Sequence, residues 1–550
     1  MNFSNLQPAF FAASGVAGGY LPHLMLAAYM ILLVGLCYVG YVKGKSTEED
    51  YYLAGRGQGA VVTSLTIMAT FFSSAALLGI PGVVYRDGAS FFLFALNLPV
   101  AGVGIYLLGN RMRKLGKARG YVTPADLLGD YYGGSAVRLL AATLSALYVL
   151  PYVIMQIKAG GYLAQRLFPD VPPLEALGMS FTMYETGIWI LSILTMAYVL
   201  IGGMRSVAWT DVIQGVLLLS GMLLAGIATI SYFGGPSGYF EKVSKLPVEA
   251  LSVPGNSGKW NAGVLFTICA FAALGAIMQP AQWMRFFSAR DSGTLRRSAL
   301  VFAILLPVCF LFGIMLVALG GQVLFPPEVT ANGVMPHPEV GSKAGEVDQV
   351  VIVMIQRVVP EMLGVSFGAI VVTIILIAVL AASMSTADSN LHALGAVLTR
   401  DVYDRFIRPE ASEAEKTWFG RIVIIIGTLL AVGLVEWSEQ SQGFNPLALI
   451  AQLMLLAIGF SAQLLPAAID ALYLHKGTRQ GAAAGMIAGL GFVILLTYKP
   501  EFSFGLTKYA HLSALGVMAN VVVFTIVSSL TQRLPQEHTN RFKRILESKD

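Results

Sequence analysis

The chain has 550 residues, of which 56% are hydrophobic and only 12% charged, and its mean hydropathy is +0.70. A soluble domain carries about twice that share of charged residues, so the composition excludes an ordinary soluble protein and predicts an all-α protein that crosses a membrane many times. The net charge of +5 does not indicate nucleic-acid binding, because Lys and Arg cluster in short loops beside apolar runs, as membrane topology requires.

Apolar stretches recur along the whole chain, and a helix needs about 20 apolar residues to cross the hydrocarbon core of a bilayer. About 13 stretches meet this requirement, and they are 21–43, 58–85, 89–109, 136–166, 184–204, 207–232, 262–286, 299–323, 365–398, 420–437, 445–474, 480–497 and 510–530. Basic residues gather in alternate loops, which predicts a plasma-membrane protein with its N-terminus outside and its C-terminus cytoplasmic. Residues 350–363 are amphipathic around Arg357 and predict a short surface helix before the ninth span.

No Walker loop and no appended catalytic module are found in the sequence, so neither ATP-driven transport nor an enzyme is expected. The three cysteines lie inside apolar segments and have no metal-ligand spacing. We therefore expect a protein whose partners are the lipid bilayer and small molecules, with no transition metal, no nucleic acid and no obligatory protein partner.

Hydroxyl side chains lie in the middle of the second span. Thr70, Ser73 and Ser74 are followed by the helix-breaking sequence Gly79-Ile80-Pro81-Gly82. Such a stretch can unwind and free backbone carbonyls for a dehydrated cation. A helix interface built from small residues explains the same pattern, and this stretch alone does not decide between the two.

The ninth span carries a polar face. Ser385, Asp388, Ser389 and His392 recur at i, i+3, i+4 and i+7, and Thr386 lies beside them. Hydroxyl and carboxylate oxygens are the ligands that a hard cation such as Na+ needs when it sheds water. The pattern favours an ion site over polar contacts between helices.

Two further charges lie at membrane depth. Asp211 in the sixth span should lie at the depth of Asp388, and two such carboxylates repel unless a cation or a proton lies between them; Asp211 as a helix cap is the alternative. Lys158 lies about ten residues, or roughly 15 Å, from the outer end of the fourth span. It needs a carboxylate partner, from a solute or from the protein.

Five segments resemble motifs of the sodium:solute symporter family, whose members import proline, sugars, sialic acid, pantothenate or monocarboxylates. They are Asp50 to Arg56 (DYYLAGR), Gly202 to Gln214 (GGMRSVAWTDVIQ), Met384 to Leu391 (MSTADSNL), Leu398 to Tyr403 (LTRDVY) and Gln463 to Tyr473 (QLLPAAIDALY). The resemblance covers nearly the whole chain in the right order.

The resemblance implies a leucine-transporter-like fold with two inverted five-helix repeats, at 58–232 and 262–474. Residues 1–57 would hold the outside N-terminus, the first span and the entry loop. Residues 475–550 would hold two further spans and a short cytoplasmic tail. The breaker Gly275 to Pro280 (GAIMQP) in the seventh span roughly matches the one in the second span.

The resemblance also implies a main sodium site. Its ligands would be the backbone carbonyls of Ala69, Phe72 and Ala382 and the hydroxyls of Ser385 and Thr386. Na+ is the expected cofactor.

A second cation site, present in some family members, maps to Asp211, Ser385, Asp388 and Ser389, and either Na+ or a proton could occupy it. Asp388 stands where a hydroxyl is usual in the sialic acid type. Phe71 replaces an acidic residue of the proline type, which argues against proline.

The resemblance implies sodium-coupled import of a small organic solute by alternating access. Solute would bind near the midplane, with Ser73, Ser74, Gln156 and Lys158 as candidate contacts. The segment Leu150 to Lys158 (LPYVIMQIK) resembles monocarboxylate-type members, so a monocarboxylate or other small organic anion is expected. The alternatives are an amino acid or vitamin symporter and a transporter-like nutrient sensor.

Overall fold

The computed structural model describes residues 21–44, 47–169, 171–176, 179–330, 333–440, 447 and 449–548. Over these residues, ten helices are long and apolar enough to cross a membrane, and two further helix pairs reach that length together but are sharply bent. One of the ten, α10 (Met183–Tyr232), has 50 residues, twice what a bilayer requires, and is broken at Gly203. Counting α10 as two spans gives the predicted 13.

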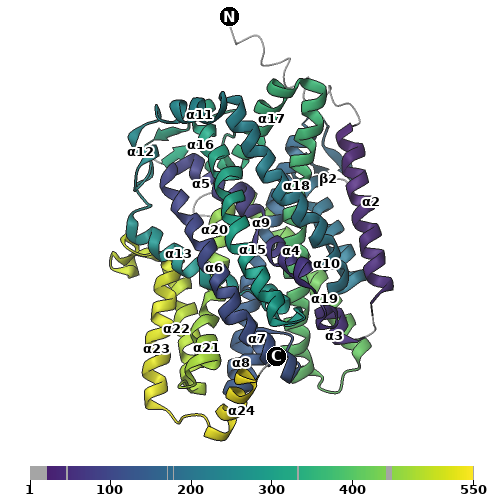
Figure 1. The fold of residues 1–550 in the computed structure, drawn as a ribbon, viewed down its shortest axis with the longest axis vertical. Helices are drawn as coiled ribbons and strands as arrows, with labels where there is room; N and C mark the ends of the chain where they lie inside the picture. Colours follow the sequence, from purple (N-terminus) through teal and green to yellow (C-terminus); the bar gives the residue numbers. More distant parts are fainter. Residues whose placement is uncertain are drawn as a thin grey trace, which may run out of the picture.

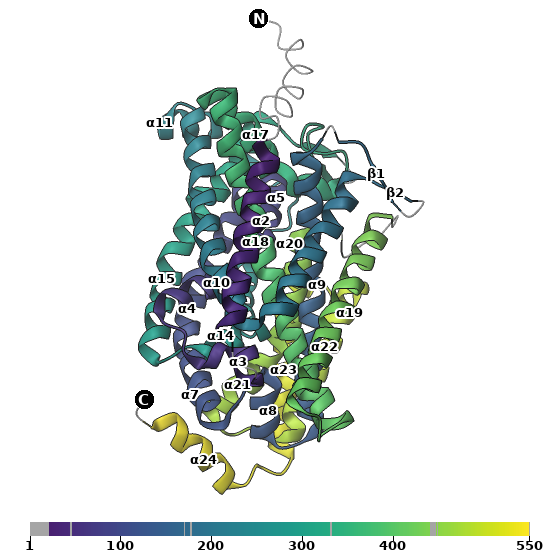
Figure 2. The same ribbon diagram turned by 90° about the vertical axis from the view of Figure 1, so that its right-hand side faces the viewer.

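The helices lie side by side along the long axis of the molecule (Figures 1 and 2). The spanning elements are α2 (Leu21–Val42), α4 (Ala60–Phe71) with η3 (Ala75–Gly79) and α5 (Ile80–Asp87), η4 (Ala89–Leu96) with α6 (Asn97–Gly104), η5 (Ile105–Gly109) and α7 (Asn110–Arg119), α9 (Ser135–Leu167), α10, α13 (Ala262–Ile277) with α14 (Pro280–Ser288), α15 (Ser292–Phe310) with η6 (Leu311–Met315) and α16 (Leu316–Leu324), α18 (Val365–Leu398) with η8 (Thr399–Ile407), α19 (Glu413–Gln440), α20 (Ile450–Ser461) with η9 (Ala462–Leu464), α21 (Leu465–Ile469) and η10 (Asp470–Leu474), α22 (Arg479–Tyr498) and α23 (Leu512–Leu530).

Short elements cover the two ends of this bundle. They are α3 (Glu48–Leu53), η2 (Ala54–Arg56), α8 (Pro124–Tyr132), the hairpins β1 (Leu174–Ala176) with β2 (Met179–Phe181) and β3 (Glu328–Thr330) with β4 (Gly333–Met335), α11 (Gly235–Val243), α12 (Val248–Leu251), η7 (Ala344–Gln349), α17 (Val350–Leu363), η11 (Pro500–Ser503), η12 (Leu506–Lys508) and α24 (Gln536–Glu547). We call the end that carries α11 and α17 the α11 end, and the opposite end, with α8 and α24, the α24 end (Figure 1).

The break in α10 turns the chain back at the α24 end. Gly203 has φ 55°, a conformation that L side chains rarely adopt, and a Cβ there would lie 2.7 Å from the ring of Tyr51. Only glycine fits both the backbone and the contact. The predicted pair of spans at 184–204 and 207–232 therefore forms a hairpin around this residue.

The two bent pairs are α4 with α5, at 56°, and α13 with α14, at 52°. Phe72 is extended and ends α4, whereas Pro280 begins α14, where its missing N–H costs nothing. The start of the first pair lies beside the end of the second, because Gln58 donates to the Ser288 carbonyl at 3.1 Å and accepts from the Arg290 N–H at 3.0 Å. The two pairs thus run in opposite directions, as inverted repeats require.

The amphipathic segment before the ninth span is the helix α17, with the predicted bounds. Most of its apolar residues are buried, and it packs against α18. Its other face carries an ion pair between Arg357 and Glu361 at 2.6 Å.

Candidate sodium and solute sites

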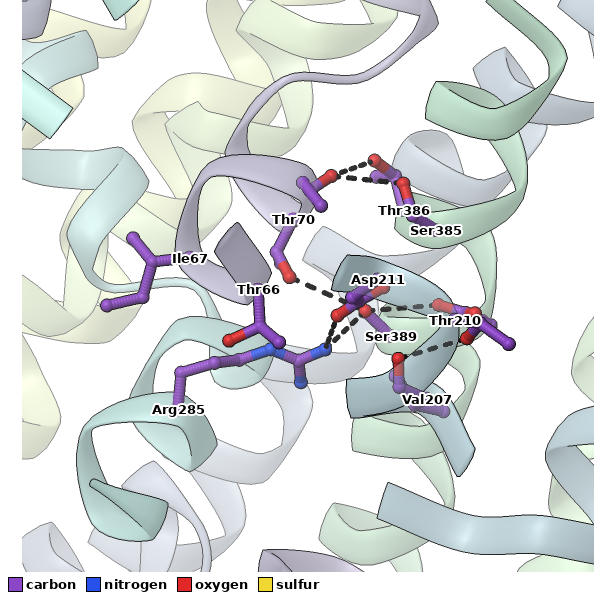
Figure 3. Close-up of polar contacts among 12 residues, drawn as sticks. Thr66, Ile67, Thr70, Val207, Thr210, Asp211, Arg285, Ser385, Thr386 and Ser389 are labelled. Atoms are coloured by element: carbon purple, nitrogen blue, oxygen red, sulfur yellow. Dashed lines mark hydrogen bonds and ion pairs between the residues drawn. The ribbon is translucent and has the colours of Figure 1, made fainter. Parts of the chain in front are cut away.

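The end of α4 meets the polar face of α18. The carbonyl of Ala69 accepts hydrogen bonds from the hydroxyls of Ser385, at 3.2 Å, and Thr386, at 3.1 Å. The Ser385 hydroxyl also lies 3.1 Å from the carbonyl of Ala382. All four residues are fully buried, and both hydroxyls point toward α4 (Figure 3).

This cluster joins four oxygens, two from carbonyls and two from hydroxyls, without a formal charge. A hydroxyl can rotate its proton away and present lone pairs, so the set suits a hard cation such as Na+. Phe72 follows Ala69 by three residues and lies at the break, 2% exposed. The structure therefore brings together four of the five predicted ligands, and the Phe72 carbonyl stays a predicted fifth.

A charged cluster lies one turn further along α18. Tyr198 donates to one carboxylate oxygen of Asp388 at 2.6 Å, and Ser389 donates to the other at 3.1 Å. Arg285, from α14, contacts Asp211 at 3.1 Å and Ser389 at 2.5 Å through the same guanidinium nitrogen (Figure 3). Asp211, Arg285, Asp388 and Ser389 are all completely buried.

Sequence reasoning missed Arg285. The residue is charged and lies inside the predicted seventh span, so the criterion that selected Lys158 applies to it equally. Asp211 lies inside the second half of α10 rather than at its start, so it is no helix cap. In the described part of the chain, Oδ1 of Asp211 and two nitrogens of Arg285 have no hydrogen-bond partner.

A small cavity lies between the two helix breaks. The space available to the centres of water molecules is about 30 Å³, enough for one or a few waters. It is lined by Phe71, Phe72, Ser73, Ala76, Ile80, Phe94, Asn97, Leu98, Tyr152, Ala272, Ala276, Gln279, Phe310, Met454 and Ile458, none of them charged.

Gln279 is the most informative residue of this cavity. It immediately precedes Pro280 at the second break and is fully buried, and neither atom of its amide group has a hydrogen-bond partner among the residues described. Buried amides without partners are costly, so such a group is a candidate solute contact. The sequence signal for this residue was the breaker that ends in Gln279-Pro280. From it we predicted a break in the helix but no role for the Gln279 side chain.

Of the four predicted solute contacts, only Ser73 lines the cavity. The side-chain carbonyl of Gln156 accepts from the Ser74 N–H at 3.0 Å and from the Ser74 hydroxyl at 2.8 Å. It thus satisfies a backbone donor that the break leaves free. Gln156 and Ser74 hold the broken helix in place.

Lys158 lies nearer the α11 end and outside this cavity. Its ammonium binds the carboxylate of Glu439 at 2.8 Å and the carbonyl of Leu447 at 3.2 Å. Tyr184 donates to the same carboxylate at 3.2 Å. The structure supplies a protein carboxylate as the partner, and it comes from α19 rather than from Asp211 or Asp388.

The sequence model of the sodium:solute symporter family matches residues 51–489. The chain belongs to this family. It is 28% identical to a sodium/proline symporter of Escherichia coli over 90% of this chain and 93% of the relative. It is 27% identical to the high-affinity proline transporter PutP of Bacillus subtilis, over 92% of this chain and 98% of the relative. It is 26% identical to a sodium/pantothenate symporter of Haemophilus influenzae, over 86% of this chain and 90% of the relative.

Solved structures confirm the leucine-transporter-like fold. A Na+-coupled sialic acid symporter matches with a TM-score of 0.72 at 19% identity, over 94% of this chain and 99% of that one. MhsT in complex with L-phenylalanine matches with a TM-score of 0.52 at 16% identity, over 85% and 98%. The chain is thus a multi-pass membrane protein and a sodium-coupled symporter of its family. Its relatives are transporters.

Proposed function

We propose that this symporter imports a small carboxylate, preferably a monocarboxylate, together with Na+ bound at Ala69, Phe72, Ala382, Ser385 and Thr386. The supporting observation is the convergence of two α18 hydroxyls on a carbonyl at the break of the second span. An ion bound there links α4 to α18. Coupling follows if one conformation of this junction binds Na+ better than the other.

The chemistry of the cavity supports a solute with one acid group and an apolar body. Ser73, Tyr152 and Gln279 offer hydroxyl and amide donors for a carboxylate. The remaining lining is mostly apolar, and the cavity must widen to admit a solute. Proline and pantothenate, the solutes named for the relatives, both carry a carboxylate.

An amino acid is the alternative solute. Its ammonium would need acceptors, and no carboxylate lines the cavity, so only neutral oxygens could serve. Phe71 lies in the lining and packs against Phe302 at 4.8 Å between ring centroids. An apolar side chain at this position favours the monocarboxylate.

Uptake into proteoliposomes tests the proposal. An inward Na+ gradient should drive accumulation of labelled monocarboxylates, whereas an equal K+ gradient should not. Proline, pantothenate and a sugar complete the panel. Accumulation of proline in preference to every monocarboxylate would overturn the solute assignment, and an absence of accumulation for the whole panel would favour the nutrient sensor.

For the second cation site, we propose that Arg285 supplies the positive charge beside Asp211 and Ser389 in this conformation. A free cation, Na+ or a proton, would bind with Asp211, Asp388 and Ser389 only when Arg285 withdraws. The 3.1 Å and 2.5 Å contacts of Arg285 support this competition.

The orientation is also part of the proposal. The α24 end carries the basic helix α7, whose sequence is NRMRKLGKAR, and the basic helix α24. Since basic loops stay on the cytoplasmic side, this end should be cytoplasmic. The repeats at 58–232 and 262–474 would then move against each other during alternating access.

A further inference from the structure

A second and larger cavity lies at the α24 end, outside the sodium and solute sites. It has a volume of about 670 Å³ and is lined by the end of α2, by α3, by the break in α10 and by the start of α19. Both views place α3 at the lower end of α2, on the outside of the bundle (Figures 1 and 2).

The floor of this cavity carries one cation that the protein does not neutralise with a carboxylate. The carboxylate of Asp50 is already paired with Arg205, which binds both of its oxygens at 2.5 to 3.0 Å. The guanidinium of Arg421 lies over the ring of Trp418 at 5.1 Å. Across the described ranges, Arg421 forms no ion pair, and its buried Nε has no hydrogen-bond partner.

A buried hydroxyl accompanies this cation. The Tyr51 hydroxyl is buried and interacts with the Arg421 guanidinium. The second acid of the lining, Glu413, accepts the Glu48 N–H at 3.2 Å. Glu413 is exposed to solvent, whereas Arg421 is half-buried. The inner part of the cavity thus presents hydrogen-bond donors and one guanidinium without a carboxylate partner, which is the chemistry that binds a phosphate.

The mouth of the cavity is apolar and aromatic. Its lining includes four exposed apolar or aromatic side chains, between 53% and 62% exposed, which are Tyr41, Val42, Ile201 and Trp418. Aromatic side chains at a helix end mark the level of lipid headgroups. Only 22% of the apolar window of α2 is buried, so this helix faces lipid along most of its length.

We propose that this cavity binds the headgroup of an anionic phospholipid. The phosphodiester would accept hydrogen bonds from Arg421 and Tyr51, and the acyl chains would lie along the exposed faces of α2 and α10. A free phosphate would satisfy the floor but would leave the apolar mouth unused. The apolar mouth would contribute hydrophobic binding energy and Arg421 would contribute electrostatic attraction, and a lipid uses both.

The bound headgroup would stabilise the joint between three parts of the fold. The ring of Tyr51 lies 5.2 Å from that of His392 on α18 and packs on the backbone of Gly203. Fixing Tyr51 from the cavity side would hold α3, the α10 break and α18 together. Lipid binding should therefore raise the melting temperature of the full-length protein.

The test is a lipid titration of delipidated protein in detergent, followed by native mass spectrometry and thermal melting. The probes are phosphatidylglycerol, phosphatidylcholine and glycerol 3-phosphate. Wild type should retain phosphatidylglycerol in preference to phosphatidylcholine, and should melt at a higher temperature with it. Arg421→Gln should weaken phosphatidylglycerol binding by about fivefold, the effect expected for one basic residue near a bilayer.

Two further variants keep the test decisive. Tyr51→Phe removes one hydroxyl, retains the ring and should reduce phosphatidylglycerol retention in the same direction. The control Arg541→Gln removes an exposed arginine from α24, which pairs with Glu537 outside the cavity, and should change nothing. Equal phosphatidylglycerol binding by wild type and both cavity variants would overturn the proposal. Binding of glycerol 3-phosphate as strong as that of the lipid would also overturn it, in favour of a soluble phosphate.

Discussion

Two polar clusters lie one helical turn apart on α18 and satisfy their buried groups in different ways. At Ser385 and Thr386, hydroxyls meet the carbonyl of Ala69 and no side chain is charged. At Ser389 and Asp388, the cluster contains two carboxylates and the guanidinium of Arg285. The first cluster would gain a charge by binding the proposed Na+, whereas the second already contains the guanidinium of Arg285 as its cation.

This contrast shows how a membrane protein can place ion-binding oxygens beside fixed charges. A buried charge is tolerated only with a partner. Neutral oxygens hold an ion by dipoles alone, so the site can release the ion without leaving a charge behind. Arg285 cannot leave Asp211 so easily, because Asp211 would then need another cation.

The largest effect should come from breaking the charged cluster. Arg285→Gln leaves Asp211 buried without its cation and should destabilise the protein by about 3–5 kcal/mol. Thermal melting in detergent measures this loss. The double variant Asp211→Asn with Arg285→Gln removes both charges and should recover most of the stability; a double variant as unstable as the single one would show that the ion pair is not the cause.

The same pair tests the second cation site. If a free cation competes with Arg285, Asp211→Asn should reduce the steepness of the Na+ dependence of uptake or abolish uptake, while folded protein remains. Unchanged steepness together with unchanged pH dependence would limit Asp211 to pairing with Arg285.

Breaking the neutral cluster should change sodium affinity rather than stability. Ser385→Ala or Thr386→Ala removes one ligand of a dehydrated ion, at a cost of about 1–3 kcal/mol, or about 5- to 150-fold in the Na+ concentration for half-maximal uptake. Solute affinity at saturating Na+ should change less. Ser383→Ala is the matched control, because the one hydrogen bond of the Ser383 hydroxyl to a described residue stays within its own helix, at the Val379 carbonyl. Wild-type Na+ dependence in both site variants would refute the assignment.

Lys158 provides a third contrast, since its partner Glu439 is partly exposed, at 32%, unlike Asp211. Lys158→Gln should reduce uptake of an anionic solute and of its neutral amide alike, by about tenfold, because the lost interaction joins α9 to α19. Parallel uptake assays of the two solutes measure this. A loss confined to the anionic solute would instead assign Lys158 to solute binding.

The smallest effect should come from an exposed carboxylate. Asp291 caps α15, and the backbone N–H of Thr294, with help from Arg290, lowers its pKa from 3.8 to about 2. Its contribution to stability is therefore present above about pH 4 and is lost as the pH falls toward 2. Asp291→Asn keeps the cap but removes the charge. The melting difference between wild type and variant should shrink between pH 7 and pH 3, by a few tenths of a kcal/mol because the side chain is 45% exposed.

Much of the fold could be predicted because spans are local features. The bounds of α18, 365–398, agree with the predicted ninth span, and those of α9 differ by one residue at each end. The face shared by Ser385 and Ser389 also follows from helical spacing alone. Both helix breaks were visible as Gly and Pro in apolar runs.

The sequence by itself determined which residues cross the membrane and which polar groups lie at its depth, because hydropathy and helical period act over neighbouring residues. Only the tertiary structure decided how these groups pair. Arg285 comes to Asp211 from 74 residues away, and Glu439 comes to Lys158 from 281 residues away. The partner of a buried charge is set by the packing of whole helices, and local sequence patterns do not show how helices pack. A single sequence therefore shows that a partner must exist, but not which residue it is.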